Sequence, residues 1–379
     1  MSDIARVNPG TALDIPESGN GIPDLLDEAR VGLEWLLKMQ RTDGAVYHKV
    51  GPDRWPGMIL PEQDRARRYV YGATSQDTAK AAAVWAMGAR IFRPFDEGFA
   101  DRLLKAATRA WQFLREHPET VDEARPGDDT GSGGYGDSAD ADDRFWAAAE
   151  LYVTTGDPDL RRFVTILSRT SAASVREIGW TNASTIGIID LIISRGAGVL
   201  AETGTGYDAD AEVREELRRR LLEKADELVR KADANPYGLL LGTADFAWGS
   251  NRAALARAML LLVADYLDPA PLPSPRLEIA LRQLDWVLGA NPLGKSFVTG
   301  VGANPVLHPH HRLSEALKRG VPGLLVGGPN SSAEDKVAPA GLGPKSYVDV
   351  ASAYSVNEPA IDYNAPLVFV VGYLLAAAR

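Results

Sequence analysis

The chain contains no cysteine. This absence excludes disulfides, a thiolate nucleophile and any metal site built on cysteine sulfur, and it leaves the redox compartment open. The N-terminus, MSDIARVNPG, lacks the apolar segment of a signal peptide, so we expect no signal peptide in this sequence. The most apolar run, residues 365–378, is too short to span a membrane and is typical of a buried helix.

Positively charged residues are also fewer than negatively charged ones. The sequence has 41 Lys and Arg against 51 Asp and Glu, a formal net charge of −10. An acidic surface repels nucleic acid and anionic membranes, so we expect neither as a partner. A neutral substrate needs no electrostatic attraction and is compatible with this charge.

What is present is mainly helical periodicity, while strand signals are weak. We expect helices over 22–40, 75–92, 97–116, 140–155, 158–175, 183–194, 208–233, 250–267, 275–289 and 365–378. SFVTGVG, residues 296–302, is the best candidate for a short extended piece. No repeat or linker divides the chain, so we expect one all-α domain over residues 1–379. Successive helical hairpins favour an α/α toroid, although composition alone does not separate it from another helical bundle.

Long irregular stretches separate some helices, at 41–74, 118–139, 235–249 and 291–348. Loops of this length are usually functional or disordered. One of them contains SFVTGVGANPVLHPHHR, residues 296–312, with three of the chain's five histidines. On an extended segment His308, His310 and Arg312 would share one side and His311 the other. The alternative is that His310 only forms hydrogen bonds within a loop and has no functional role.

A second stretch, YVDVASAYSVNEPAIDYNAP, covers residues 347–366 and contains Asp349 and Glu358. On one helix these two acids, nine positions apart, would face opposite sides, so they share a site only if the chain bends. Pro359 and Pro366 make a loop plausible, with Asn364 as N-cap of the last helix. The alternative is a pair of solvated loop acids.

Together the two stretches resemble the two signature regions of glycoside hydrolase family 9, a family with many cellulases. The matching residues are Ser296, Val298, Gly302, Asn304, Pro309, His310 and Arg312, then Tyr347, Asp349, Tyr354, Glu358, Ala360, Asn364 and Ala365. The segments IPESGNGIPDLLDEARVGLEWLLKMQ, DADDRFWAAAELY, WGSN and LGANPLGKSFVTG also look like that family. The resemblance covers nearly the whole chain.

The resemblance implies an (α/α)6 toroid-type barrel that hydrolyses β-1,4-glucosidic bonds with inversion. It implies Glu358 as general acid, His310 and Arg312 lining the sugar cleft, and Asp349 orienting the neighbourhood of these three residues. A general acid must hold its proton near neutral pH, so we expect its surroundings to raise the pKa of Glu358. Inversion also needs a second carboxylate, roughly 6.5–9.5 Å away, that activates water.

The sequence departs from the family at this second carboxylate. The family's base lies in an Asp-Ala-Gly-Asp motif, which does not occur here. The resemblance therefore suggests a family domain without its N-terminal segment. Residues 2–7 would then supply only the last turn of the first helix. We expect weaker hydrolysis, and either lower stability or a homodimer that covers the gap. Asp140, Asp142 and Asp143 are interpreted as a cluster at a helix N-terminus rather than as the base.

Aromatic residues in loops or at helix ends are candidates for stacking on sugar rings, with core packing as the alternative. These residues are Trp55, Tyr135, Trp180, Trp248 and Tyr354. No cofactor is required, but the Asp- and Gly-rich residues 126–143 could hold a structural calcium ion.

Three alternatives remain open from the sequence. The substrate could be a β-glucan or cello-oligosaccharide cut internally, or one cut from its end by a β-glucosidase or glucosaminidase. The chain could instead bind oligosaccharides without hydrolysing them, or act as an interaction scaffold. The family resemblance implies a secreted or periplasmic location.

Overall fold

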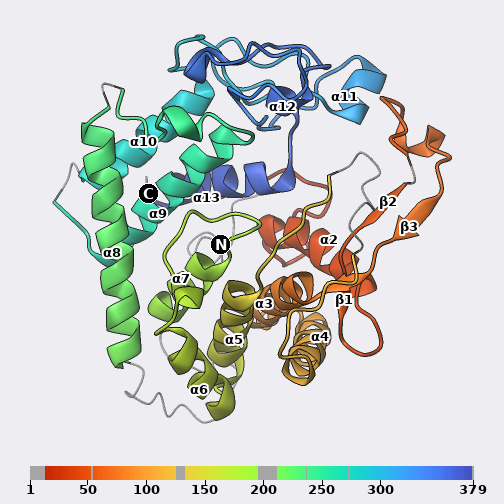
Figure 1. Cartoon of the computed structure of the whole chain (residues 1–379), viewed down its shortest axis with the longest axis vertical. Helices are drawn as coiled ribbons and strands as arrows, with labels where there is room; N and C mark the ends of the chain where they lie inside the picture. Colours follow the sequence, from red (N-terminus) through yellow and green to blue (C-terminus); the bar gives the residue numbers. More distant parts are fainter. Residues whose placement is uncertain are drawn as a thin grey trace. The chain divides into compact units, whose positions relative to one another are not determined.

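The computed structural model describes residues 13–52, 54–124, 133–194, 211–235, 237–271 and 274–377 (Figure 1). The chain forms two compact units. Unit 1 comprises Met1–Trp55, Arg67–Arg176 and Trp180–Arg220, and unit 2 comprises Pro56–Ala66, Glu177–Gly179 and Leu221–Arg379.

Unit 1 is built from helical hairpins. Its helices are α2 (Asp24–Lys38), α3 (Ser75–Phe92), α4 (Glu97–Glu116), α5 (Ala141–Thr155), α6 (Pro158–Leu167) and α7 (Ser184–Ile193). Helix α3 packs against α4 and α5, and α5 in turn packs against α6 and α7. The pairs α3–α4 and α5–α6 are hairpins with short loops, whereas α3–α5 and α5–α7 bring together helices that are not consecutive in the chain.

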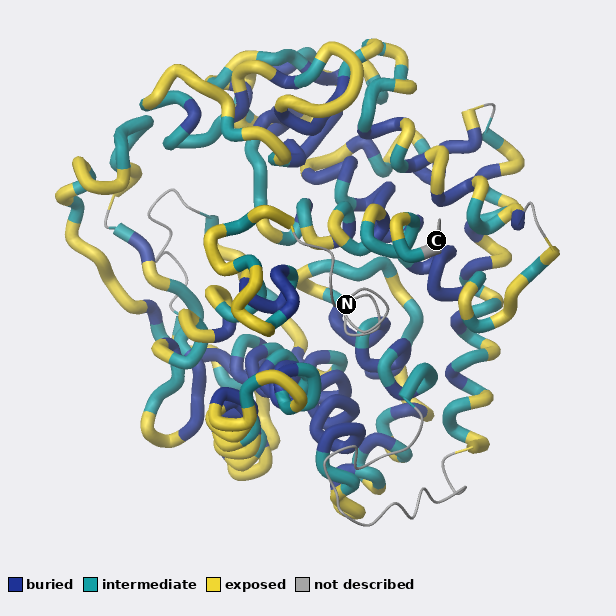
Figure 2. Tube along the Cα trace, turned by 180° about the vertical axis from the view of Figure 1, so that it is seen from behind, coloured by how far each residue is buried: buried dark blue, intermediate teal, exposed yellow. Residues whose placement is uncertain are grey.

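Alanine makes the central position of α3 possible. Six of its alanines are buried, namely Ala79, Ala81, Ala82, Ala83, Ala86 and Ala89. Short side chains allow neighbouring backbones to approach closely while the burial of methyl groups still stabilises the contact. Helices α3 and α5 accordingly form the buried centre of unit 1 (Figure 2).

Two small antiparallel ladders lie within residues 41–74, which we expected to be irregular. Strand β1 (Val46–Tyr47) pairs with β4 (Ala73–Thr74), and β2 (Val50–Pro52) pairs with β3 (Arg68–Val70). Strands of two or three residues are too short to show the period-2 alternation that identifies a strand in sequence. The ladders therefore hold residues 46–52 against residues 68–74.

Unit 2 contains most of α8 (Ala211–Asp233), whose first ten residues belong to unit 1. It also contains α9 (Ser250–Leu267), α10 (Pro275–Leu288), α11 (Arg312–Leu317), α12 (Tyr354–Asn357) and α13 (Ile361–Ala377). Helix α9 packs against α10 and α13. The expected extended piece is present, because Val298 bridges Leu325, while Val326 bridges Pro359.

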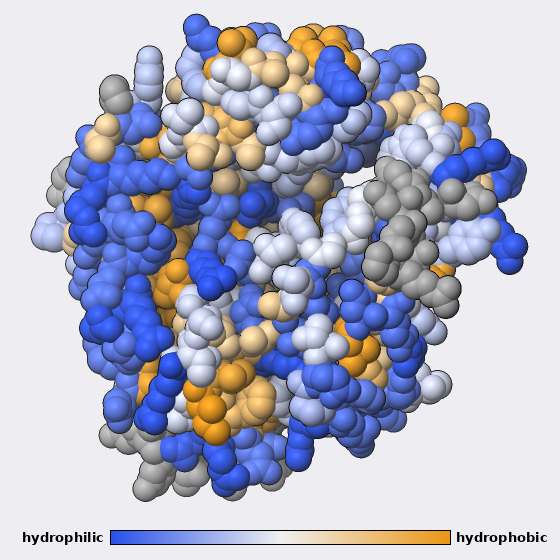
Figure 3. Space-filling model, viewed as in Figure 1, coloured by the Kyte–Doolittle hydropathy of each residue, from blue (hydrophilic) through white to orange (hydrophobic). Residues whose placement is uncertain are grey.

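Helix α8 shows how an amphipathic sequence divides between core and solvent. Its buried residues recur at helical spacing, at Leu217, Leu221, Ala225, Leu228 and Ala232. The opposite side carries ion pairs one turn apart, such as Arg219 with Glu216 at 2.8 Å. The surface over α8 in Figure 3 is correspondingly hydrophilic.

Most expected helices agree with the structure to within a few residues, but two boundaries were wrong. Helix α6 ends at Leu167 rather than 175, because the following Ser and Thr side chains bond to the backbone, as Thr170 does to the N–H of Ala172. Helix α13 starts at Ile361 rather than 365, so Asn364 is not its N-cap. The Asn364 amide instead donates to the carbonyl of Ala360 (2.9 Å) and accepts from the N–H of Leu325 (3.0 Å).

The expected last turn of a first helix, at residues 2–7, lies outside the described residues. Among the helices that are described, none combines the length and apolar character needed to cross a membrane.

Candidate active site

Four candidate residues, two in each unit, lie just before the N-termini of helices. In unit 2, Trp248 precedes α9 and Glu358 precedes α13. In unit 1, Tyr135 precedes α5 and Trp180 precedes α7. The loops that lead into these helices therefore carry four of the side chains that sequence analysis selected, while Arg312 and Tyr354 are themselves the first residues of α11 and α12.

The histidine segment is positioned by a tight turn over residues 296–306. The N–H of Ser296 donates to Ala303 (2.6 Å), and the N–H of Val306 donates back to Ser296 (3.1 Å). Gly302 has φ +81°, and a Cβ there would lie 2.6 Å from the carbonyl oxygen of Leu288. Only glycine fits this position without displacing backbone, which explains its place in the motif.

His310 is held at both its backbone and its ring. Its N–H donates to the carbonyl of Asn357 (2.9 Å), and its Nδ1 lies 2.6 Å from the carbonyl oxygen of Ala351. A carbonyl only accepts, so Nδ1 carries a proton in this arrangement. The imidazole also lies 5.8 Å from the ring of Tyr354, between centroids.

Glu358 ends the short helix α12 and is half-buried. Its N–H donates to Tyr354 (3.1 Å), and its carbonyl accepts from the N–H of Gly327 (3.0 Å), which fixes its backbone. Burial raises the pKa of the Glu358 carboxyl, the charge of His310 opposes this shift, and the nearby charge of Asp362 adds to it. The expected raised pKa is therefore found, and its main cause is loss of hydration.

Asn357, which sequence analysis did not select, joins the two signature regions. Its side chain is fully buried and accepts a hydrogen bond from the Tyr347 hydroxyl. Its Nδ2 donates to the carbonyls of Val348 (2.8 Å) and Val350 (3.0 Å). The backbone carbonyl of Asn357 also accepts from the N–H of His310 (2.9 Å), so this one residue ties the histidine segment to residues 347–350.

Asp349 supports the loop that precedes His310. Its carboxylate pairs with Lys295 Nζ (2.8 Å) and accepts from the N–H groups of Leu307 (3.0 Å) and His308 (2.9 Å). Burial opposes ionisation, but the hydrogen bonds from Lys295 and the two N–H groups prevail and lower the pKa of Asp349. These contacts fix the backbone of residues 307 and 308, just before His310.

Arg312 corrects one expectation from the sequence. It is the first residue of α11, so the extended segment ends at His311, and His310 and Arg312 do not share the side of a strand. Nη1 of Arg312 lies 3.4 Å from Oδ2 of Asp64, whose side chain is 1% exposed. The other oxygen of Asp64 accepts from the N–H of Ala66 (2.9 Å). No local pattern could identify this partner, because 248 positions separate the two residues.

The candidate aromatic residues form two pairs, one in each unit. Trp248 and Tyr354 lie 5.8 Å apart between centroids, with exposed fractions of 40% and 38%. Tyr135 and Trp180 lie 6.1 Å apart, with exposed fractions of 56% and 46%. Trp55 is exposed as well. Rings this exposed are not core residues, and their faces are suited to stacking on sugars.

The acidic residues at the start of α5 form ion pairs and hydrogen bonds with neighbouring residues. Lys80 lies between Asp143 (3.0 Å) and Asp137 (3.1 Å), and burial raises the pKa of Asp143 to about 8 against the opposing charge of Lys80. Asp140 pairs with Arg144 (2.9 Å), and Asp142 accepts from the N–H of Ala183 (3.0 Å). These contacts agree with a structural role at the helix N-terminus.

Calcium binding by residues 126–143 stays a prediction, because residues 125–132 lie outside the described residues. Across the described parts of the chain, no group of three or more His, Cys, Asp or Glu side chains is placed to hold a metal ion.

Comparison with known sequences gives one family. The model of glycosyl hydrolase family 9 matches residues 11–371. Endoglucanase D of Acetivibrio thermocellus is 35% identical over 363 residues, covering 94% of this chain and 54% of that protein. A xyloglucan-specific endo-beta-1,4-glucanase of Bacteroides ovatus is 34% identical over 383 residues, covering 97% of this chain and 62% of that protein. The chain thus spans little more than half the length of these curated relatives.

Solved structures agree. A metagenome-derived glycoside hydrolase family 9 endoglucanase matches with a TM-score of 0.90 and 48% identity, covering 99% of this chain and 66% of that one. AaCel9A, solved with a cellobiose-like isofagomine, matches with a TM-score of 0.85 and 32% identity, covering 99% of this chain and 71% of that one. The helical structure and these matches confirm the expected fold class, an all-α protein of the (α/α)6 barrel type.

Proposed function

The chain belongs to glycosyl hydrolase family 9, and we propose on this basis that it hydrolyses β-1,4-glucosidic bonds in cellulose or a related β-glucan. The observation that carries the proposal is Glu358, a half-buried carboxyl with a raised pKa at the end of α12, in the segment that His310 also contacts. A carboxyl in these surroundings keeps its proton to a higher pH than an exposed glutamate does, as a general acid requires.

In the proposed reaction Glu358 donates its proton to the glycosidic oxygen as the bond to the anomeric carbon breaks. Water attacks from the opposite face of the ring, and a second carboxylate takes its proton, which inverts the anomeric centre. The proposal assigns Glu358 to the acid side of this reaction. His310 and Arg312 bind sugar hydroxyls, and Asp349 positions the loop that carries His310.

We propose that the two aromatic pairs, Trp248 with Tyr354 and Tyr135 with Trp180, serve as stacking platforms for sugar rings. Pyranose rings present flat C–H faces, which pack on exposed aromatic rings. Exposed platforms favour internal cleavage of a polymer over removal of one terminal sugar. A polymeric glucan as substrate agrees with the secreted or periplasmic location expected from the family.

Reducing-sugar release from carboxymethylcellulose and from cello-oligosaccharides tests this proposal. Glu358→Gln keeps the size of the side chain but has no proton to donate, so its kcat should fall by about 10²–10⁴-fold. Glu62→Gln is the matched control, because Glu62 is exposed, in a 3-10 turn of the same unit. Equal activity of the Glu358 variant and the wild-type chain would contradict the assignment.

A second candidate function is oligosaccharide binding without hydrolysis, which the two exposed aromatic pairs would equally support. In that case neither the wild-type chain nor Glu358→Gln releases sugar, but cellotetraose still raises the melting temperature of both proteins. Hydrolysis by the wild-type chain would eliminate this candidate.

A further inference from the structure

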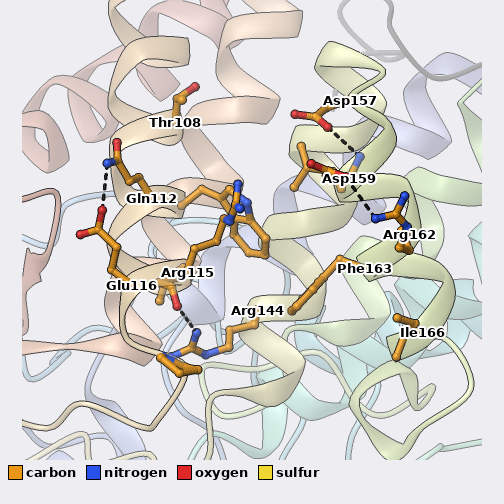
Figure 4. A pocket seen from close by; sticks show the side chains of 14 residues that line it. Thr108, Gln112, Arg115, Glu116, Arg144, Asp157, Asp159, Arg162, Phe163 and Ile166 are labelled. Carbon is orange, nitrogen blue, oxygen red and sulfur yellow. Dashed lines mark hydrogen bonds and ion pairs between the residues drawn. The ribbon is translucent and has the colours of Figure 1, made fainter.

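A groove of about 900 Å³ lies between α4 and α6 within unit 1. It is separate from every candidate residue described above. Figure 4 shows side chains from the two helices facing one another across it, with Arg144 of α5 at its base. We refer to it as the α4–α6 groove.

The floor of the α4–α6 groove is apolar and aromatic. Trp111 of α4 and Phe163 of α6 meet edge to face, with centroids 5.2 Å apart and planes at 83°. Leu160 and Ile166 continue the apolar surface, and Ile166 is 59% exposed. An edge-to-face pair braces the two rings without covering both faces of either, so ring surface remains available to a ligand.

The walls of the groove carry flat polar groups on both sides. Gln112 and Glu116 project from α4, while Asp157, Asp159 and Arg162 lie at or on α6 (Figure 4). Their mutual bonds are exposed, as between Gln112 and Glu116 (2.9 Å) and between Arg162 and Asp159 (3.4 Å). Exposed bonds of this kind contribute little to stability, so sugar hydroxyls can replace them at small cost.

The charges of the lining argue for a neutral ligand. Arg144 is neutralised by Asp140 (2.9 Å), which leaves the charges of Arg115 and Arg162 against three carboxylates, Glu116, Asp157 and Asp159. This balance gives no net attraction for nucleic acid, an acidic peptide or an anionic lipid surface. An aromatic floor that leaves ring surface exposed between planar donors and acceptors is instead complementary to a pyranose, whose ring faces are apolar and whose edges carry hydroxyls.

We propose that the α4–α6 groove is a second binding site for a neutral β-linked glucan chain, distinct from the site of Glu358. The choice of a glucan rests on the proposed function, which supplies a polymer long enough to engage two sites. A second attachment would hold the protein on the polymer and raise the effective concentration of glucan at the first site. It would matter for polymers and little for short oligosaccharides.

The test uses native gels that contain hydroxyethylcellulose, with Glu358→Gln as the non-hydrolysing parent. Adding Trp111→Ala should weaken retention of the parent by about tenfold, equivalent to about 1.4 kcal/mol. Gln112→Ala should weaken retention by a smaller factor, and it keeps a strong helix former at an exposed position, so folding is preserved. Lys105→Ala, exposed on α4 but outside the groove, is the matched control and should bind as the parent does.

Hydrolysis of cellotetraose by chains with an intact Glu358 separates this proposal from the proposed function. Trp111→Ala and Gln112→Ala should leave that rate unchanged while weakening attachment to the polymer. If both variants are retained in the gel as strongly as the parent, the groove does not bind glucan. If sedimentation instead shows that Trp111→Ala dissociates a dimer, the groove is a contact between copies of the chain. Failure of the wild-type chain to cleave cellotetraose overturns the proposed function alone, because the gel measures binding.

Discussion

Two clusters of residues in unit 2, here called corners, shift the pKa of a carboxyl group in opposite directions. The Asp349 corner consists of Asp349, Lys295 and the backbone of Leu307 and His308. The Glu358 corner consists of Glu358, His310 and Asp362. Both acids lose hydration by burial, yet the pKa of Asp349 is lowered by its donors, whereas burial and a neighbouring acid raise the pKa of Glu358. Surrounding donors, rather than burial alone, decide which carboxyl keeps its proton.

The largest effect should come from breaking the link between the corners. Asn357→Leu leaves the carbonyl of Val348 and the Tyr347 hydroxyl without the amide that bonds them, whereas the carbonyl of Val350 keeps the N–H of Ala353 (3.0 Å). Unsatisfied buried groups of this kind should lower the free energy of unfolding by about 3 kcal/mol. The loss of kcat should exceed tenfold, because small displacements of catalytic groups are costly.

Urea unfolding and cello-oligosaccharide kinetics of Asn357→Leu measure the two effects. Asn357→Asp is a second variant: it retains the acceptor for Tyr347 but sets a buried carboxylate oxygen against the carbonyls of Val348 and Val350, so it should be at least as destabilised as Asn357→Leu. A Leu variant with wild-type stability would show that the link is dispensable.

The pH dependence of kcat/KM tests whether the pKa of Glu358 is raised. Glu358 acts in its protonated form, and its pKa is raised by burial and by Asp362, so activity should persist above the ordinary glutamate pKa of about 4.3. Beyond the raised pKa, kcat/KM should fall tenfold per pH unit. Asp362→Asn removes one raising charge and should move this limb to lower pH. If the alkaline limb of the kcat/KM profile stays at the same pH in Asp362→Asn, Asp362 does not raise the pKa of Glu358.

Asp349→Asn tests the opposite corner through stability. The pKa of Asp349 is lowered by Lys295 and the two N–H groups, so its contribution is present above the unfolded pKa and lost as pH falls through the folded one. The variant should be less stable by about 2 kcal/mol at neutral pH. Melting temperatures across pH should show the difference disappearing in acid. A constant difference at every pH would mean that ionisation of Asp349 contributes nothing.

Asp64→Asn should have the smallest effect. It replaces an ion pair with Arg312, whose side chain is 28% exposed, by a neutral contact. A less firmly held Arg312 should raise KM about fivefold, equivalent to about 1 kcal/mol, with kcat nearly unchanged. Glu62→Gln on the same loop is the control, and steady-state kinetics on cellotetraose supply the numbers. A fall in kcat at unchanged KM would place Asp64 in the chemical step instead.

Sequence patterns predicted the helices well because their apolar residues recur at helical spacing, as the α3 and α4 boundaries show. They failed where tertiary contacts decide. The start of α13 depends on the bonds of Asn364 to Ala360 and to Leu325, which lies 39 positions away. The short pairs β1–β4 and β2–β3 carry too few residues for a pattern.

For the candidate site, the family motifs identified Glu358, His310, Asp349 and Arg312, but not what holds them. Asn357 stood beside Glu358 in the motif, and only the structure reveals its contacts with Val348, Val350 and Tyr347. Lys295 and Asp64 contact their partners across 54 and 248 positions, and no local periodicity encodes such distances.

The most direct test of Glu358 as proton donor compares two leaving groups. The rates of the wild-type chain and Glu358→Gln would be measured on cellotetraose and on 2,4-dinitrophenyl β-cellobioside, whose leaving group departs without protonation. The account predicts a loss of about 10²–10⁴-fold on cellotetraose and almost none on the activated substrate. Equal losses on both substrates would contradict the assignment of Glu358 as the acid.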